Sequence, residues 1–322
     1  MSWILLGIPA GILLLYYGSE WMVDGAKRMA VRLGVTPFVI GLTVVAFGSS
    51  APEVVTSLVS GENPQIILGN IVGSNIANIG LAIGLAAVIF PIACKFSDIK
   101  FEIISMIAAV SLITLLALTG SLGFVAGIIL VLSLIVFVFF VYRLKKGTAE
   151  GGAYEDTVSE EEITKTKMWK CILMIVSGIV LLYVGANIFI DGAVELAGMF
   201  GVSDLMIGLI VVAIGTALPE MCICIVAAYH KDSELVVSNI VGSIVFNSFF
   251  ALGIGVIFTT VSVSYYTMFF HLPVMIIMSI LLAYMIKRDD NVSRAESIIL
   301  LAVYATYIGL MMIFPALTQS II

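Results

Sequence analysis

The sequence predicts an all-α polytopic membrane protein with ten transmembrane helices in two inverted-topology repeats of five. Three observations lead to this prediction. Of the 322 residues, 61% are hydrophobic and only 11% are charged, which is more apolar surface than a soluble core can bury. Apolar runs of about 20 residues, the length that spans a bilayer, recur along the whole chain. The second half of the chain also repeats the first.

Ten apolar segments can be delimited, and one hydrophilic stretch divides them into two groups of five. This stretch runs from Arg143 to Lys170 and combines sustained charge and glycine with no apolar periodicity, so we expect a solvated linker. The expected segments are 3–31, 36–60, 65–91, 99–119, 122–143, 168–198, 204–229, 234–260, 266–286 and 295–318. The corresponding domains are 1–144 (first repeat), 145–167 (cytoplasmic linker) and 168–322 (second, inverted repeat).

The basic residues predict the orientation of the chain. All 15 of them fall near the connections after the first, third, fifth, seventh and ninth segments. Because cytoplasmic loops carry the excess of Lys and Arg, these connections are expected inside. We therefore expect a multi-pass protein of the plasma (cell) membrane with both termini outside and the central linker in the cytoplasm. Lipid is the expected surrounding, no basic cluster suits a nucleic acid, and no protein partner is evident.

The repeat is visible in two matched blocks. Residues 18–53 align without a gap on residues 185–220 at an offset of 167, and "DGA", "IGL", "VVA" and "PE" coincide. A second block pairs "GNIVGSNIANIGLAIG" with "SNIVGSIVFNSFFALG" at an offset of 169. Since five is an odd number, two repeats of five segments must cross the membrane in opposite senses, an architecture typical of secondary transporters.

Each half contains two segments that helix-breaking residues should interrupt. Proline removes a backbone donor, and glycine loosens the helix around it. Polar groups freed in this way cannot face lipid and must line a cavity within the protein. The expected interruptions are 48–53, 73–78, 215–220 and 242–247.

Two carboxylates define the expected chemistry. Of 21 acidic residues, only Glu53 and Glu220 lie deep inside apolar segments, and no basic residue lies nearby to pair with them. Such carboxylates are either protonated or bound to a cation. Carboxylates, hydroxyls and carbonyls together suit a hard cation such as Ca²⁺ or Na⁺. Two glutamates can balance one Ca²⁺ or two Na⁺ but not both loads, so the two ions should compete, which favours exchange.

The motifs "GSSAPE" and "GTALPE", each followed by a "GS…N" segment, resemble the alpha-repeats of the cation/calcium exchanger superfamily. The nearest branch is that of the Na⁺/Ca²⁺ exchangers, including their archaeal members. The resemblance implies an antiporter that works by alternating access, with Ca²⁺ and Na⁺ as substrates, no cofactor and no enzymatic activity. It also implies a set of ligands: Glu53 and Glu220 for both ions; Ser49 and Thr216 for Ca²⁺; Ser50, Ser74 and the Ala46 carbonyl for an inner Na⁺; Ser243, Thr216 and the Ala213 carbonyl for an outer Na⁺; and Asn78 and Asn247 at the centre.

The chain departs from the family pattern at two positions. Ala217 replaces the serine usual in the second motif, whereas its counterpart Ser50 keeps the hydroxyl. We therefore expect an outer Na⁺ site that is either weakened or completed by a water molecule. Asn247 stands where K⁺-dependent relatives carry aspartate. A neutral side chain removes a charge that an additional K⁺ needs, so we expect no K⁺ requirement.

Three other functions remain open at this stage. An H⁺/Ca²⁺ antiporter would use the same glutamates to bind protons. An intramembrane diacid enzyme needs two close acids and a water pocket, but it does not call for an inverted repeat with matched interruptions. A cation channel differs from an exchanger in that its flux does not depend on a counter-ion.

Overall fold

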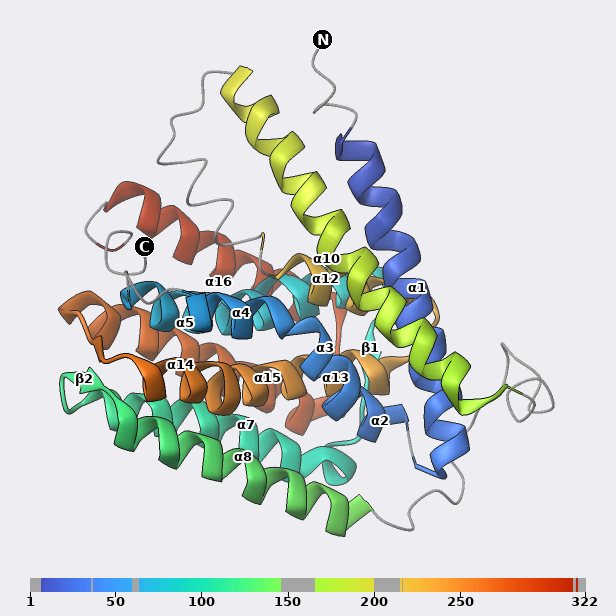
Figure 1. The fold of residues 1–322 in the computed structure, drawn as a ribbon, viewed down its shortest axis with the longest axis horizontal. Helices are drawn as coiled ribbons and strands as arrows, with labels where there is room; N and C mark the ends of the chain where they lie inside the picture. Colours follow the sequence, from blue (N-terminus) through green and yellow to red (C-terminus); the bar gives the residue numbers. More distant parts are fainter. Residues whose placement is uncertain are drawn as a thin grey trace.

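A computed structural model describes residues 7–35, 37–59, 64–145, 166–199, 215, 217–314 and 317. Almost all of them are helical, and Figure 1 shows one bundle of roughly parallel helices with two long helices leaning across it. The elements of the first half are α1 (Gly7–Leu33), α2 (Pro37–Ile40), η2 (Gly41–Val45), α3 (Ala46–Ser49), α4 (Ala51–Val59), α5 (Gln65–Ala77), η4 (Asn78–Ile83), α6 (Gly84–Ile89), β1 (Ile92–Ala93), α7 (Phe96–Ala117), β2 (Ser121–Leu122) and α8 (Phe124–Lys145). Those of the second half are α10 (Met168–Met199), α12 (Leu218–Tyr229), α13 (Ser233–Phe246), η5 (Asn247–Ala251), α14 (Leu252–Phe258), β3 (Val261–Ser262), η6 (Thr267–His271), α15 (Leu272–Asp289), β4 (Asn291–Val292) and α16 (Arg294–Ile313).

Seven helical stretches of the described chain are long and apolar enough to cross a membrane on their own. An eighth is counted if α1 and the helices that follow it, which bend by 117°, form one span. These stretches differ in their place in the bundle. Within an 18-residue stretch of each span, 83% is buried in the span 233–258 and 78% in the span 66–89, but only 28% in the span 124–141. The "GS…N" segments therefore form the centre of the protein, and α8 forms part of its edge.

The two long helices α1 and α10 lie side by side and cross the remaining helices at a steep angle (Figure 1). Glycine allows this close contact. A Cβ atom at Gly178 would lie 2.8 Å from the Gly18 carbonyl oxygen, and one at Gly11 would lie 2.9 Å from the Gly185 carbonyl oxygen. Small residues at a helix crossing let the two backbones approach in this way.

The predicted interruption near Pro52 is present as a turn at Ser50 between α3 and α4. The predicted interruptions at 73–78 and 242–247 are wrong in kind. Both stretches stay helical, and the irregularity is a π-helical segment that begins at Asn78 (η4) or at Asn247 (η5). π-Helical segments are rare in proteins, and those that occur are often found at functional sites. Gly242 instead permits close packing, because a Cβ there would lie 2.5 Å from the Leu42 carbonyl oxygen.

Two short strand pairs join the halves of the chain. Strand β1 pairs antiparallel with β4, so that Ile92 faces Val292, and strand β2 pairs with β3, so that Leu122 faces Val261. Both pairs connect loops that lie more than a hundred residues apart in the sequence. The predicted linker 145–167 falls, apart from its ends, outside the described residues.

Asp232 connects the start of α13 to α1. Its carboxylate accepts a hydrogen bond from the backbone N–H of Leu235 (3.0 Å), which caps α13, and it lies 3.2 Å from the Lys27 ammonium. A second contact joins α1 to the end of α12, where Oε1 of Glu20 lies 3.0 Å from Nε2 of His230.

We expect Asp232→Ala to lower the free energy of unfolding by about 1–2 kcal/mol, because the helix cap and a partly buried ion pair are both lost. Thermal unfolding in detergent measures the effect. Asp232→Asn is the matched control, since asparagine also caps helices but carries no charge, and it should recover most of the loss. An equal loss in both variants would show that the cap contributes nothing.

Candidate cation site

The two intramembrane glutamates lie at the starts of two helices. Glu53 is in the first turn of α4, directly after the turn at Ser50, and Glu220 is in the first turn of α12. Both side chains are 0% exposed, and each lies within the electrostatic field of the other. The fold thus brings together the two carboxylates that the sequence singled out.

The two carboxylates have different surroundings. The Ser50 hydroxyl donates to Oε1 of Glu220 over 3.4 Å, and the Ser49 hydroxyl also faces this carboxylate. The Ser74 hydroxyl lies near the carboxylate of Glu53. Within the described part of the chain, no well-formed hydrogen bond reaches either oxygen of Glu53 or Oε2 of Glu220.

Ser49 links the α3–α4 turn to α13. Its hydroxyl lies 3.4 Å from the Ser243 hydroxyl and 3.5 Å from Oδ1 of Asn239. It also donates to the Ala46 carbonyl over 3.3 Å, and this carbonyl accepts the backbone N–H of Ser50 as well. A cation that binds the Ala46 carbonyl would therefore have to replace the Ser49 hydroxyl.

The two central asparagines begin the π-helical segments, and both are 0% exposed. Asn247 donates from Nδ2 to Oδ1 of Asn75 over 3.4 Å, which leaves its own Oδ1 without a donor. Neither amide atom of Asn78 has a hydrogen-bond partner among the described residues.

Five buried oxygens of the glutamates and central asparagines consequently accept no well-formed hydrogen bond in the described chain. They are Oε1 and Oε2 of Glu53, Oε2 of Glu220, Oδ1 of Asn78 and Oδ1 of Asn247. The asparagines lie near the glutamates, because η5 packs against α4 and η4 packs against α12. Buried acceptors that lack donors cost free energy unless a cation or protons satisfy them. Because the set consists of carboxylate and amide oxygens, it suits a hard cation. The described residues hold no group of three His, Cys, Asp or Glu side chains that could bind a metal, so a zinc-type cluster is not formed there.

Not all predicted ligands can be placed. Thr216 and Ala213 lie outside the described residues, whereas Ala217 is described and fully buried. Three buried polar residues were not predicted from the sequence: Asn75, Asn239 and Ser248. Asn239 contacts Ser49, Asn75 contacts Asn247, and Ser248 contacts Asn75. A signal for Asn239 was present, because "NIVGS" occurs in both matched blocks.

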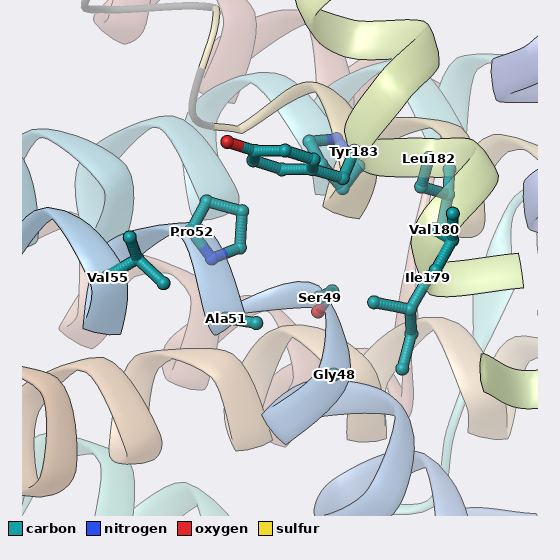
Figure 2. A pocket seen from close by; sticks show the side chains of 10 residues that line it. Gly48, Ser49, Ala51, Pro52, Val55, Ile179, Val180, Leu182 and Tyr183 are labelled. Carbon is teal, nitrogen blue, oxygen red and sulfur yellow. The ribbon is translucent and has the colours of Figure 1, made fainter. Parts of the chain in front are cut away.

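An apolar pocket of about 260 Å³ lies next to the site, between α10 and the α3–α4 turn. In Figure 2, Ile179 and Tyr183 of α10 face Gly48, Ser49 and Pro52 across this pocket. Apart from the Ser49 and Tyr183 hydroxyls, its lining side chains are apolar. Since such a lining cannot replace the hydration shell of a cation, the pocket is not the cation site.

Comparison with known proteins identifies the family of the chain. The family description "Sodium/calcium exchanger protein" matches residues 3–143 and 170–313, which is most of the chain and includes both glutamates. The chain belongs to the sodium/calcium exchanger family.

Relatives of this exchanger-family chain match it over almost its full length. An uncharacterized membrane protein of Methanocaldococcus jannaschii is 33% identical over 303 residues, covering 91% of this chain and 93% of the relative. The sodium/calcium exchanger MaX1 of Methanosarcina acetivorans is 28% identical over 341 residues, covering 92% and 95%. The structure of the sodium-calcium exchanger NCX_Mj soaked with Na⁺ and Sr²⁺ is 30% identical with a TM-score of 0.80, covering 96% of this chain and 99% of that one.

Proposed function

We propose that the protein exchanges Na⁺ for Ca²⁺ across the membrane by alternating access, at a midplane site that contains Glu53 and Glu220. The observation that carries this proposal is the set of five buried oxygens, on Glu53, Glu220, Asn78 and Asn247, that accept no well-formed hydrogen bond in the described chain. A protein interior holds such a set at a cost unless an ion occupies it for part of the cycle. The names of the sodium/calcium exchangers that resemble the chain support the choice of ions.

Charge balance explains why the two ions would be exchanged and not carried together. Glu53 and Glu220 together supply two negative charges, which neutralise one Ca²⁺ or two Na⁺. A site that held both loads would carry an uncompensated positive charge in a medium of low dielectric constant. Binding of one ion therefore opposes binding of the other. Ser49, Ser50, Ser74, Ser243, Asn78 and Asn247 would complete the coordination, together with Thr216 and the Ala46 and Ala213 carbonyls.

We also propose the ten-helix inverted repeat, which the internal contacts support. The offset of 169 residues that relates Asn78 to Asn247, the first residues of η4 and η5, also relates the start of β1 to that of β3. Contacts between the halves also have counterparts in which the two halves change places: β1 pairs with β4, and β3, the repeat partner of β1, pairs with β2. Likewise Gly11 approaches Gly185, while Gly18 approaches Gly178. This reciprocity is the contact pattern of two halves related by a pseudo-twofold axis.

Movement of α1 and α10 across the other helices would open the site alternately to the two sides. The two helices pack mainly against each other, and glycines line their crossing. With the termini outside, the ties of Lys27 to Asp232 and of Glu20 to His230 join α1 to the bundle on the cytoplasmic side. These ties would break and re-form once in each cycle.

Ca²⁺ flux into proteoliposomes tests the proposed coupling, with Na⁺, H⁺ and K⁺ gradients imposed one at a time. We expect an outward Na⁺ gradient to drive Ca²⁺ uptake, with no requirement for K⁺ on either side. Uptake driven by a pH gradient in the absence of Na⁺ would instead establish an H⁺/Ca²⁺ antiporter. Ca²⁺ flux that needs no counter-ion would indicate a channel.

A further inference from the structure

The side chain of Asn247 is held in one orientation by residues that do not belong to the proposed ligand set. We propose that Asn75, with Ser248 and Met275, is a positioning residue that turns the carbonyl oxygen of Asn247, and not its NH₂ group, toward the transported cations. This inference rests on the proposed function and adds a determinant of cation affinity to it.

The first step is the contact between the two amides. Asn247 donates from Nδ2 to Oδ1 of Asn75 over 3.4 Å, and both residues are completely buried. In a planar amide, the oxygen points away from the side on which the nitrogen is engaged. Oδ1 of Asn247 accordingly has no donor and is left as a ligand for a cation.

The second step is the orientation of Asn75 itself. Its Nδ2 donates to the Ser248 hydroxyl over 3.2 Å and lies 3.6 Å from the sulfur of Met275. A hydroxyl can donate or accept, but a thioether sulfur can only accept. If the Asn75 amide were reversed, its oxygen would face the sulfur and its NH₂ would face the NH₂ of Asn247. Met275 thus excludes the reversed orientation, and Asn75 passes this constraint on to Asn247.

The repeat lacks a second copy of this arrangement. At the offset of 169 residues, Asn247 corresponds to Asn78, but Asn75 corresponds to Ile244 and Ser248 to Ile79. Isoleucine cannot hydrogen-bond an amide. In agreement, both amide atoms of Asn78 are without a partner in the described chain. The two central asparagines are therefore not equivalent: Asn247 is a fixed acceptor, and Asn78 can turn either end of its amide to the site.

Substitution of Asn75 tests the proposal. In Asn75→Leu, which keeps the branching and the number of side-chain heavy atoms but removes the acceptor, the Asn247 amide can rotate and present its NH₂ to the cation. We expect the KM for Ca²⁺ in Na⁺-driven uptake to rise about 10-fold, the effect of one lost polar interaction, with a maximal rate within about threefold of wild type. Ser279→Ala is the matched control, because among the described residues this buried hydroxyl bonds only the Met275 carbonyl of its own helix. The KM of this variant should stay at the wild-type value.

A double-mutant cycle separates positioning from general packing. A carboxylate presents an oxygen whichever way it turns, so in an Asn247→Asp background Asn75→Leu should change the KM by less than about twofold. An equal rise in both backgrounds, or an unchanged KM in Asn75→Leu alone, would overturn the proposal.

A readout that does not depend on transport keeps this test separate from that of the exchanger function. Ca²⁺ should raise the unfolding temperature of the purified wild-type protein, and the Ca²⁺ concentration for half of this shift should be about 10-fold higher in Asn75→Leu. If Asn75→Leu does not fold, the double variant Ser248→Ala/Met275→Leu replaces it. This variant keeps Asn75 but removes the contacts that orient its amide, so it should also need a higher Ca²⁺ concentration for half of the shift. Protection of that folded variant at wild-type Ca²⁺ concentrations would refute the positioning role, whereas lack of uptake by wild type would refute the exchanger function.

Discussion

Glu53→Gln and Glu220→Gln should each reduce Na⁺-driven Ca²⁺ uptake by about 100-fold or more. Each substitution preserves shape but removes half of the charge that balances Ca²⁺ in a fully buried site. An uncompensated buried charge costs about 3–5 kcal/mol, which corresponds to two or more orders of magnitude in affinity or rate. Initial rates of ⁴⁵Ca²⁺ uptake into proteoliposomes measure the effect directly.

The control for this pair is Glu296→Gln. Glu296 is also buried, but it caps α16 through Ser293 and pairs with Arg288. Glutamine can keep the cap, so uptake should remain within about twofold of wild type. Uptake by Glu53→Gln or Glu220→Gln at the level of this control would refute the proposed site.

Gly242→Val should reduce Ca²⁺ uptake by about 10-fold or more. A Cβ at this position would already lie 2.5 Å from the Leu42 carbonyl oxygen and 2.6 Å from the Ala46 Cβ. Valine would therefore separate α13 from α3, and with them Ser243 from Ser49, whose hydroxyls now lie 3.4 Å apart. Overpacking of this kind costs about 1–3 kcal/mol. Initial uptake rates, together with the unfolding temperature, report the loss.

Gly309→Val is the comparison for this steric argument. Gly309 also lies within a helix, α16, but a Cβ there would meet no other atom within 4 Å. The two variants share the same intrinsic cost of a β-branched residue in a helix, so a larger defect in Gly242→Val isolates the contact with α3. Equal behaviour would show that the close approach of these helices is unimportant for transport.

Seven of the ten segments expected from hydropathy coincide with helices of the described chain that are long and apolar enough to cross a membrane, because a bilayer sets the length of its spanning elements. The turn at Ser50 was also predictable, since proline and glycine lie beside it. The π-helical segments at Asn78 and Asn247 were not, because they depend on how neighbouring helices pack and not on local backbone preference. Glycine, read in the sequence as a helix breaker, serves at Gly242 to admit a neighbouring backbone instead.

The carboxylates of Glu53 and Glu220 could be predicted as site residues because an acidic residue is costly at membrane depth. The amides around them could not be assigned in the same way. Asn75 and Asn239 are common polar residues in an apolar context, and only the fold shows that Asn75 holds Asn247 while Asn239 faces Ser49. Their hydrogen bonds connect residues more than 150 positions apart, beyond the reach of any local pattern.

The central claim is that one site, built on Glu53 and Glu220, serves both ions. Equilibrium binding of ⁴⁵Ca²⁺ to the purified protein at increasing Na⁺ concentrations tests it most directly. We predict that Na⁺ raises the Kd for Ca²⁺ without lowering the amount bound at saturation, and that Glu220→Gln abolishes the binding at every Na⁺ concentration tested. A Kd that does not change with Na⁺, or a fall in the amount bound at saturation with an unchanged Kd, would contradict the claim.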